Sequence, residues 1–262
     1  MEMEFLLKVK AGIEAAEREA AAMMLQAHDI MPESKTDARN VVTEYDCKVQ
    51  AYLVEKLSEL VPGACFFCEE NNMQDSLTNE HVFIIDPIDG TMNFVHGLRH
   101  SCISVAYASR GELLAGAVYN PYQDEMYSGV KDGGAFLNGK RMKVDDAGLK
   151  QSLVLCGTAP YNPSLTDKTF EIMKKSFNAG LDIRRQGAAA LDVANVAAGR
   201  AGLFFELETC LWDVAAGLVL LREAGGICMR FDGEVFEHKG GKQSVIVAGE
   251  KTYKDFAEMI KE

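Results

Sequence analysis

The first sixty residues carry apolar side chains at helical spacing. These apolar residues recur every three or four positions between charged ones, which predicts helices over about 4–30 and about 46–60. A polar stretch over 32–40 separates the two helices, and the turn formers Pro62 and Gly63 end the second. The chain is therefore expected to begin with two helices that each bury one side.

Short apolar runs follow, and their length is typical of strands. We expect strands at 81–85, 102–108, 113–119, 135–137 and 141–144. Arg110-Gly111 stands between the second and third of these runs, and Asn138-Gly139 stands between the last two. Asn-Gly is typical of a two-residue turn in which both positions need a positive φ. The last two runs are therefore predicted to form a hairpin.

From about residue 152, predicted strands alternate with predicted helices. The strands are expected at 152–156, 182–185, 202–207, 227–231 and 244–248. The helices are expected at 166–177, 187–198 and 213–224, and a last helix closes the chain. Such alternation is typical of an α/β arrangement. Because no repeat or flexible linker separates the halves, we predict one compact domain over 1–262, with an α+β half over 1–148 and an α/β half over 149–262.

Composition and charge narrow the range of functions. Of the 262 residues, 48% are apolar and 25% are charged, which excludes a wholly disordered or fibrous protein. The chain has 27 basic and 39 acidic side chains and a formal charge of -12, the sign opposite to that of a generic nucleic-acid binder. An acidic protein that binds an anion needs a local cation, which is a lysine, an arginine or a metal ion.

The seven cysteines bear on the compartment and on redox chemistry. Their odd number and scattered positions favour reduced thiols and a cytoplasmic location. The start of the chain is acidic, and no stretch reaches the roughly 20 apolar residues of a membrane span, so we expect neither a signal peptide nor a membrane anchor. Cys65 and Cys68 have CxxC spacing without a second pair. That spacing alone favours buried thiols over a dithiol redox site, which stays an alternative.

The most informative segment is an apolar run that ends at Asp86, with Asp89 three residues later. Glu69 lies upstream, and Thr91 supplies a hydroxyl just after the aspartates. Asp-Pro and Asp-Gly are also turn formers, so a surface turn is the alternative. However, α/β proteins bind ligands where strands end, and Pro87 restricts the backbone between the aspartates. We therefore treat this segment as a candidate site.

A cluster of these carboxylates would need a cation. Two unit charges about 4 Å apart repel by about 4 kcal/mol at an effective dielectric constant of about 20. Ligation by oxygen atoms alone selects Mg²⁺, Mn²⁺ or Ca²⁺ over zinc. Asp213 begins a predicted helix. There it is either a simple helix cap or a further ligand that connects the two halves.

Two motifs carry a family resemblance: Asp86-Pro-Ile-Asp-Gly-Thr-Met-Asn-Phe94 and Leu211-Trp-Asp-Val-Ala-Ala-Gly217. They resemble the signatures of the inositol monophosphatase family, which are Mg²⁺-dependent, Li⁺-sensitive sugar phosphatases. Other segments similar to that family are Lys35 with 42–46, then 67–70, 184–192 and 204–206. The likeness covers nearly the whole chain. It implies a layered α-β-α-β-α sandwich of the inositol monophosphatase and fructose-1,6-bisphosphatase type, commonly a homodimer.

The resemblance also implies a set of metal ligands. Glu69, Asp86 and the carbonyl of Ile88 would hold one ion, and Asp86, Asp89 and Asp213 would hold a second. A third, looser ion would lie near Glu69. The cofactor implied is thus two or three Mg²⁺ ions, with Mn²⁺ as a substitute.

The same resemblance assigns residues to the water and to the phosphate. Asp46 and Thr91 would orient and polarise the attacking water beside Glu69. The backbone N–H groups of Gly90 and Thr91 would receive the phosphate, next to Asp89. Lys35 would be a nearby cation.

For the rest of the substrate, the resemblance implies contacts from two segments. Glu206 would accept hydrogen bonds from substrate hydroxyls, with Gly187, Ala188 and Ala189 beside the ring. Ala188 stands where many family members have Ser or Thr. One hydrogen bond to the substrate is therefore expected to be absent.

Three further residues are candidates: Glu70, Arg184 and Arg185. The two arginines either meet a second phosphate or cover the surface. The expected function is Mg²⁺-dependent hydrolysis of inositol monophosphate by activated water, without a covalent intermediate. Met92-Asn93 after Asp-Gly-Thr favours this substrate over 3′-phosphoadenosine 5′-phosphate, while the arginines keep fructose 1,6-bisphosphate open. The alternative from another class is a non-catalytic metal-binding relative that acts through partners.

Overall fold

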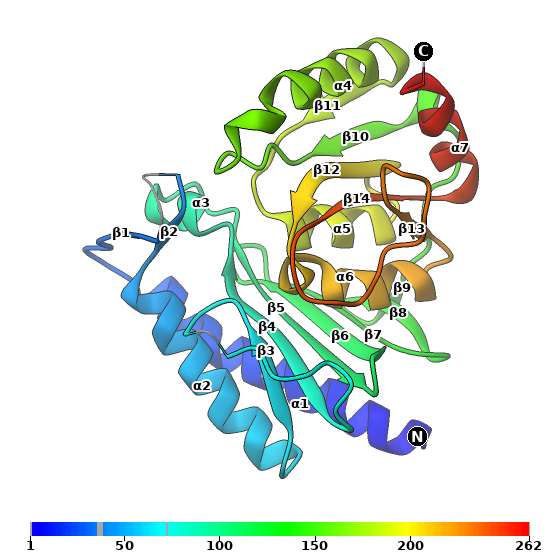
Figure 1. Cartoon of the computed structure of the whole chain (residues 1–262). Helices are drawn as coiled ribbons and strands as arrows, with labels where there is room; N and C mark the ends of the chain where they lie inside the picture. The colour runs from blue at the N-terminus through cyan, green and yellow to red at the C-terminus, as the bar shows by residue number, and fades with distance from the viewer. Residues whose placement is uncertain (1, 36–38, 72, 262) are drawn as a thin grey trace.

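Helices and sheets stack in five layers, in the order helix, sheet, helix, sheet, helix (Figure 1). The structure is a computed structural model that describes residues 2–35, 39–71 and 73–261. Layer by layer, the helices are α1 (Met3–Leu25) with α2 (Glu44–Leu60), α5 (Ala189–Ala197) with α6 (Leu211–Glu223), and α4 (Thr166–Ala179) with α7 (Glu250–Met259). This order confirms the predicted sandwich.

A seven-stranded sheet lies between the first two helical layers, with strand order β3-β4-β5-β6-β7-β8-β9. Strands β3 and β4 are parallel, and every later pair is antiparallel. The strands are β3 (Cys65–Cys68), β4 (Val82–Asp89), β5 (Cys102–Ser109), β6 (Glu112–Asn120), β7 (Glu125–Val130), β8 (Gly134–Leu137) and β9 (Lys140–Arg141).

A five-stranded sheet lies between the last two helical layers, with strand order β11-β10-β12-β14-β13. Strand β10 is parallel to β11 and β12, whereas β14 is antiparallel to β12 and β13. The strands are β10 (Leu153–Cys156), β11 (Asp182–Arg184), β12 (Leu203–Thr209), β13 (Ile227–Met229) and β14 (Gln243–Ala248). A separate two-stranded antiparallel sheet is formed by β1 (Glu33–Ser34) and β2 (Val41–Val42). The remaining short elements are α3 (Thr91–Val95), η1 (Leu149–Gln151) and η2 (Pro163–Leu165).

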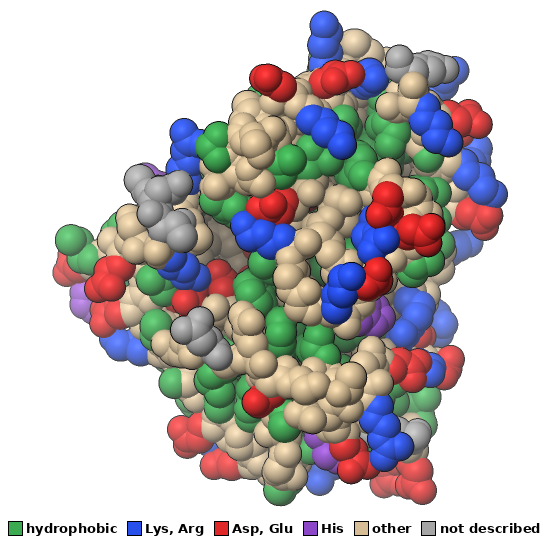
Figure 2. Space-filling view, in the orientation of Figure 1, with side chains coloured by type: hydrophobic (Ala, Val, Ile, Leu, Met, Phe, Trp, Pro, Cys, Tyr) green, Lys and Arg blue, Asp and Glu red, His purple; other side chains and the backbone are tan. Residues whose placement is uncertain are grey.

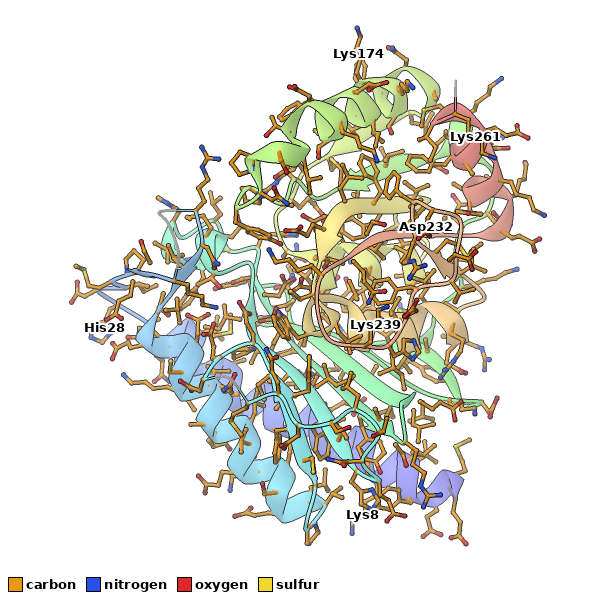
Figure 3. The ribbon with its side chains drawn as sticks, in the orientation of Figure 1. Lys8, His28, Lys174, Asp232, Lys239 and Lys261 are labelled. Carbon is orange, nitrogen blue, oxygen red and sulfur yellow. The ribbon has the colours of Figure 1, made fainter. Side chains whose placement is uncertain are left out.

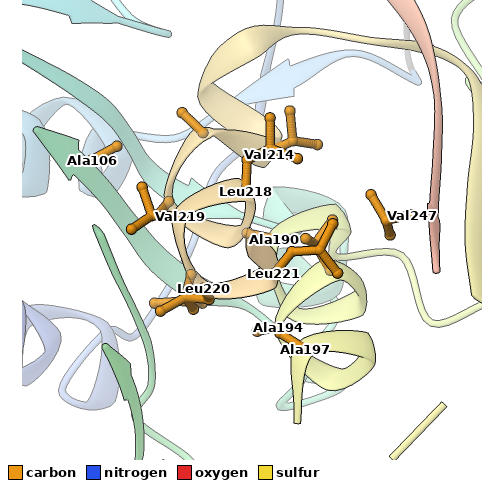
Figure 4. Close-up of a cluster of buried hydrophobic side chains, with 14 of the residues drawn as sticks. Ala106, Ala190, Ala194, Ala197, Val214, Leu218, Val219, Leu220, Leu221 and Val247 are labelled. Atoms are coloured by element: carbon orange, nitrogen blue, oxygen red, sulfur yellow. The ribbon is translucent and has the colours of Figure 1, made fainter. Parts of the chain in front are cut away.

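Both faces of the sheets are covered by helices, so their central strands are continuous apolar runs. In β4, Phe83 and Ile85 pack toward α1 and α2, while Val82 and Ile84 pack toward α5 and α6. This alternation follows from the two-residue period of a strand. Figure 4 shows part of the middle cluster, where aliphatic side chains of α5, α6 and β14 meet.

The predicted hairpin at Asn138-Gly139 is confirmed. These two residues have φ of 47° and 78° and join β8 to β9. The second strand of this hairpin ends at Arg141 and not at residue 144 as predicted. The reason is that the N–H of Val144 donates to the carbonyl oxygen of Ala224 and not to the neighbouring strand. Residues past Arg141 thus pack against the end of α6.

Other predicted boundaries were wrong in detail. The first helix ends at Leu25 and not near residue 30. Strands β3 and β7 were not predicted from the sequence. In β7, Glu125, Tyr127, Ser128 and Gly129 mix polar and small residues in a run that no periodicity rule assigns to a strand. Pairing with β6 and β8 makes it one.

Helix α6 lies directly on β6 because Gly116 has no side chain. A Cβ on Gly116 would lie 2.8 Å from the carbonyl oxygen of Ala216. Helix α6 also contacts β4. This close packing brings Asp213, in the first turn of α6, toward the two aspartates of β4.

The outside of the molecule is strongly charged. Lys8, Lys174 and Lys261 are exposed, and they project away from the ribbon in Figure 3. Among the helices that the structure describes, none combines the length and the apolar composition needed to cross a membrane.

Candidate active site

A pocket of about 390 Å³ lies where the end of β4, the start of α5, β12 and the start of α6 meet. The space-filling view shows a hollowed surface near its centre, where acidic and basic side chains lie side by side (Figure 2). Predicted site residues that line the pocket are Glu69, Asp89, Gly90, Thr91, Arg185, Gly187, Ala188, Ala189, Glu206 and Asp213. Asp46, Asp86 and Ile88 adjoin these residues just behind the pocket wall.

Asp86 and Asp89 both belong to β4, which runs on to Asp89 instead of ending at Asp86 as predicted. The register with β5 shifts between the two aspartates. Buried Asp86 accepts a hydrogen bond from the N–H of Ile88 at 3.1 Å. Asp89 accepts hydrogen bonds from the N–H groups of Ala189 at 3.2 Å and Ala190 at 2.8 Å. The carboxylate at the end of β4 is therefore bonded to the start of α5.

Asp46 and Thr91 form a hydrogen-bonded pair. Gly90, with φ of 83°, turns the chain from β4 into α3 and places Thr91 at the start of that helix. The Thr91 hydroxyl lies 3.2 Å from Asp46 Oδ1 and 3.0 Å from the carbonyl oxygen of Ile88. On its other oxygen, Asp46 accepts from the N–H and hydroxyl of Thr43, at 2.8 and 2.5 Å. These contacts hold buried Asp46 in one orientation.

Asp213 caps α6 and also lines the pocket. Its Oδ2 accepts hydrogen bonds from the Cys210 N–H and the Thr209 hydroxyl, both at 2.8 Å. The cap predicted for Asp213 is therefore confirmed, and it leaves the residue at the pocket wall. On β12, Glu206 accepts a hydrogen bond from the N–H of Ala159 at 2.9 Å. It lines the pocket from the five-stranded sheet, whereas Asp89 lies on the seven-stranded sheet.

Lys35 lies against the glutamates of the site. Its Nζ donates to Glu69 Oε1 at 2.7 Å and also contacts Glu70 Oε1. Gln50 holds the backbone of Glu70 through two hydrogen bonds of 3.0 Å. The ammonium therefore offsets the charge of two carboxylates beside the pocket.

The electrostatics of the pocket favour a bound cation. Burial, followed by the charges of neighbouring carboxylates, raises the pKa of Asp86 well above its usual value. Burial and the charge of Asp213 raise the pKa of Asp89 to about 8. Burial is also the main cause that raises the pKa of Asp46 and Asp213 to about 6 and that of Glu206 to about 7. Each carboxylate costs free energy to ionise here, and a cation would lower that cost.

The donor atoms fit a hard divalent cation. The candidate ligands Glu69, Asp86, Asp89, Asp213 and Ile88 offer only carboxylate and carbonyl oxygens, which Mg²⁺, Mn²⁺ and Ca²⁺ prefer. As the side chains lie, no group of three acidic, histidine or cysteine residues in the described ranges has the spacing of one metal site. The fit therefore rests on donor chemistry and on the repulsion between the carboxylates.

Comparison with known proteins decides the family. Residues 3–262 match the profile of the "Inositol monophosphatase family". The chain belongs to the inositol monophosphatase family. An inositol-1-monophosphatase of Mesorhizobium japonicum is 39% identical over 196 residues, which is 73% of each chain. This confirms the resemblance seen in the motifs.

Other relatives of this family member carry different names. A putative Nus factor SuhB of Neisseria meningitidis serogroup B is 36% identical over 84% of this chain and 85% of its own. The crystal structure of the extragenic suppressor protein suhB from Bartonella henselae has a TM-score of 0.89 at 30% identity, and the match covers 96% of this chain and 98% of that one. The layered fold is therefore shared with solved members of the family.

Several residues that line the pocket were given no role by sequence reasoning, and among them Arg39, Tyr161 and Asp192 carry polar side chains. Asp192 is buried, and its Oδ1 has no hydrogen-bond partner among the residues that the structure describes. Burial, then the charges of Asp89 and Glu206, raise its pKa well above the usual value. The signal available in the sequence was an aspartate inside the apolar run of α5.

Arg184 and the Cys65–Cys68 pair, which the sequence also singled out, do not form part of the pocket. Arg184 is exposed, contacts Asp182 and does not line the pocket. Cys65 and Cys68 lie on opposite faces of β3, because residues three apart on a strand point to opposite sides. They cannot form a dithiol pair, and burial raises the pKa of the Cys68 thiol to about 12.

Proposed function

We propose that this chain hydrolyses small polyol or sugar phosphate monoesters with the help of Mg²⁺, and that inositol monophosphate is the substrate to test first. The observation that carries the proposal is the set of carboxylates beside one pocket of a family member: Asp86 and Asp89, which are buried, and Asp213, which is half-buried. A pocket of that charge can hold a phosphate only if cations lie between the two. The proposal therefore links the acidic site to an anionic substrate.

The proposed ligands follow the family pattern. Glu69, Asp86 and the carbonyl of Ile88 would hold one ion, Asp86, Asp89 and Asp213 a second, and the neighbourhood of Glu69 a third. When bound, such ions activate water, neutralise phosphoryl charge and stabilise the leaving oxygen. The capping bonds of Asp213 leave its Oδ1 for this purpose, because both of them end on Oδ2.

The chain's own contribution to proton transfer would come from Thr91 and Asp46. Both donors of Thr43 end on Asp46 Oδ2, so Oδ1 is the oxygen that faces the Thr91 hydroxyl. The hydroxyl can then accept a hydrogen bond from the attacking water while it donates to Asp46. Gly90 and Thr91 would offer their N–H groups to the phosphate. No side-chain nucleophile is needed in this scheme.

The remainder of the substrate would lie between Glu206 and the segment 187–189. Glu206 uses Oε1 for the N–H of Ala159, which leaves Oε2 to accept from a substrate hydroxyl. Ala188 is buried and has no polar side-chain atom to offer. Discrimination among polyols is therefore expected to depend mainly on Glu206.

The proposal has alternatives of two kinds, other substrates and a non-catalytic role. Fructose 1,6-bisphosphate and 3′-phosphoadenosine 5′-phosphate are alternative substrates for the same chemistry. The alternative from another class of function is a non-catalytic role through partner proteins. A relative named as a putative Nus factor SuhB supports this alternative. A homodimer and inhibition by Li⁺ are further parts of the proposal, testable by light scattering and by the assay below.

The test is phosphate release from inositol 1-phosphate, fructose 1,6-bisphosphate and 3′-phosphoadenosine 5′-phosphate, with and without Mg²⁺. Asp89→Asn is compared with Asp232→Asn, a matched change at an exposed residue that is labelled in Figure 3. We expect Asp89→Asn to lower turnover at least about 100-fold. Asp232→Asn should behave like the unmodified chain.

The outcomes separate the alternatives. Circular dichroism has to show that Asp89→Asn is folded, because Asp89 also accepts from the N–H groups of Ala189 and Ala190. Mg²⁺-dependent release that is lost in Asp89→Asn supports the proposal. Full activity in that variant would refute the assigned site. No release from any substrate by a folded, Mg²⁺-binding protein would favour a role through partners.

A further inference from the structure

A second pocket, of about 350 Å³, lies on the outer face of the five-stranded sheet, where α4 and α7 cover that sheet (Figure 1). We call it the outer pocket. Its apolar wall is formed by Ile172, Phe231, Ile246, Tyr253 and Ile260. These side chains belong to, or pack against, the buried cluster between the sheet and the two outer helices. The outer pocket is therefore built on the helical layer that lies farthest from α1 and α2.

The five-stranded sheet separates the outer pocket from the candidate active site. In β12, Phe205 belongs to the outer cluster, whereas its neighbour Glu206 lines the active-site pocket. In β14, Ile246 lines the outer pocket, whereas Val245 and Val247 belong to the cluster around α5 and α6. Both strands follow the rule that successive residues point to opposite faces. A ligand in the outer pocket would therefore not compete with the substrate for space.

Phe231 gives the outer pocket an aromatic surface that is held in place from behind. Its ring makes edge contacts with the rings of Phe205 and Phe256, at centroid distances of 6.1 and 6.2 Å. Those two rings are fully buried, but Phe231 is only half-buried. Part of the Phe231 ring is thus left for contact with a flat ring on a ligand, which is a favourable arrangement for aromatic groups.

The charged side chains of the outer pocket are mainly basic, in a protein whose formal charge is -12. Two of the cations are already neutralised. Lys175 forms an ion pair of 3.1 Å with Glu171, and Arg230 forms an ion pair of 3.0 Å with Asp232. Glu171 and Asp232 also line the pocket. The carboxylates there are therefore held by cations and do not oppose an anionic ligand with a free charge.

Two further lysines, Lys168 and Lys261, line the outer pocket and are exposed. Neither forms an ion pair with a carboxylate among the residues that the structure describes. Lys168 Nζ lies 5.8 Å from the centroid of the Phe231 ring. Lys261 follows the end of α7 and is labelled in Figure 3. Uncompensated positive charge thus lies at the edge of an aromatic and aliphatic wall.

We propose that the outer pocket binds a small aromatic anion, which is a flat apolar ring that carries an acidic group such as a carboxylate. The ring would pack on Phe231 and the neighbouring isoleucines, and the acidic group would meet Lys168 and Lys261. A polyol phosphate would leave the apolar wall without a partner, so the ligand differs in class from the proposed substrate. The inference does not depend on the proposed function, because the sheet separates the two pockets.

The test measures binding of 2-naphthoate by isothermal titration calorimetry at about pH 7, with 2-naphthol as the uncharged compound that has the same ring. EDTA is present, so that no divalent ion in the active site attracts the carboxylate. We expect 2-naphthoate to bind saturably and 2-naphthol to bind at least about fivefold more weakly. Higher ionic strength should weaken the binding of 2-naphthoate alone, because the two lysines are exposed.

Variants locate the binding within the chain. Lys168→Gln combined with Lys261→Gln removes both unpaired charges and should raise the Kd of 2-naphthoate about fivefold. Lys174→Gln is the matched control on α4, because Lys174 is exposed and lines neither pocket. Phe231→Leu keeps an apolar side chain but removes the ring, and should weaken the binding of both compounds. Arg185→Ala should leave the Kd unchanged, because Arg185 lines the active-site pocket.

Weaker binding in the double lysine variant and in Phe231→Leu, with Lys174→Gln and Arg185→Ala unchanged, would support the outer site. Circular dichroism has to show that Phe231→Leu is folded, because the ring packs on Phe205 and Phe256. If it is not, the lysine variants decide the test, since they change only exposed side chains.

Three results would overturn the proposal. The first is equal affinity for the two compounds, or no saturable binding of 2-naphthoate up to about 1 mM. The second is a loss of binding in Arg185→Ala, because the compound would then occupy the active-site pocket. The third is a loss in Lys174→Gln as large as in the double lysine variant, because a general change of surface charge would then explain both.

Discussion

Replacing the buried carboxyl of Glu17 on α1 tests how burial of an ionisable group affects the unfolding free energy. Glu17 is fully buried under α1, where that helix packs on β5 and β6. Neither carboxyl oxygen has a hydrogen-bond partner among the described residues. Burial, followed by the charge of Glu14, raises the pKa of Glu17 well above its usual value of 4.5. The backbone of Val105, which lies near the carboxyl without forming a hydrogen bond of good geometry, and the charge of Arg18 offset only part of this effect.

The sign of the pH effect follows from the raised pKa. Above about pH 4.5 the unfolded chain releases the proton of Glu17 while the folded chain keeps it, so the unfolding free energy falls as pH rises. The loss grows until pH reaches the pKa of the folded state. Each pH unit costs about 1.4 kcal/mol, which gives at most about 3.4 kcal/mol at pH 7. Glu17→Gln removes this loss, because an amide does not titrate in this range.

The assay is urea unfolding of the unmodified chain, Glu17→Gln and Glu4→Gln between about pH 4 and about pH 8, with EDTA present so that bound metal does not add to stability. Glu4→Gln is the control on the same helix, at an exposed position. We expect Glu17→Gln to be more stable than the unmodified chain at pH 7, by no more than the bound of about 3.4 kcal/mol. The difference should shrink toward pH 4. A difference that does not vary with pH, or a less stable variant at pH 8, would refute the reasoning.

Three further predictions concern packing, proton transfer and metal binding. Gly116→Val should destabilise the fold by about 2–3 kcal/mol, because the new side chain meets the backbone of Ala216; an unchanged Tm would contradict this. Asp46→Asn should lower kcat about 100-fold while Mg²⁺ affinity changes less than about threefold, and the reverse pattern would make Asp46 a ligand. Mg²⁺ affinity measured by calorimetry should rise from about pH 6 to about pH 8, because Asp89, with a pKa of about 8, has to lose its proton first; equal affinities would argue against Asp89 as a ligand.

Much of the architecture could be predicted because its determinants are local. The apolar spacing of α1 and the Asn138-Gly139 turn are each set by a few neighbouring residues. The motifs around Asp86 and Asp213 pointed to the family from the sequence alone, because each motif consists of residues that are close together in the chain. Local signals failed at β7, where Tyr127 and Gly129 are in a strand only because β6 and β8 pair with it.

The residues of the candidate site likewise fall into those that the sequence could predict and those that it could not. Asp86, Asp89 and Thr91 could be selected from the sequence, because they lie close together in one motif at the end of a strand. Asp192 could not, because its place beside the site follows only when β4 and β12 bring the charges of Asp89 and Glu206 close to it. The hydrogen bond from Thr91 to Asp46 joins α3 to α2 across 45 residues of sequence, so residue spacing within one motif does not reveal it.

Residue types alone dictate what chemistry is available: oxygen ligands that call for a hard cation, helices with one apolar side and turns that need a positive φ. Which of those residues meet is decided by the tertiary structure. Arg184 and Arg185 are chemically the same, yet one contacts Asp182 on the surface and the other lies over Gly187 in the pocket. The reason is physical: adjacent residues of an extended chain point to opposite sides, and only the packed sheet determines which side faces the site.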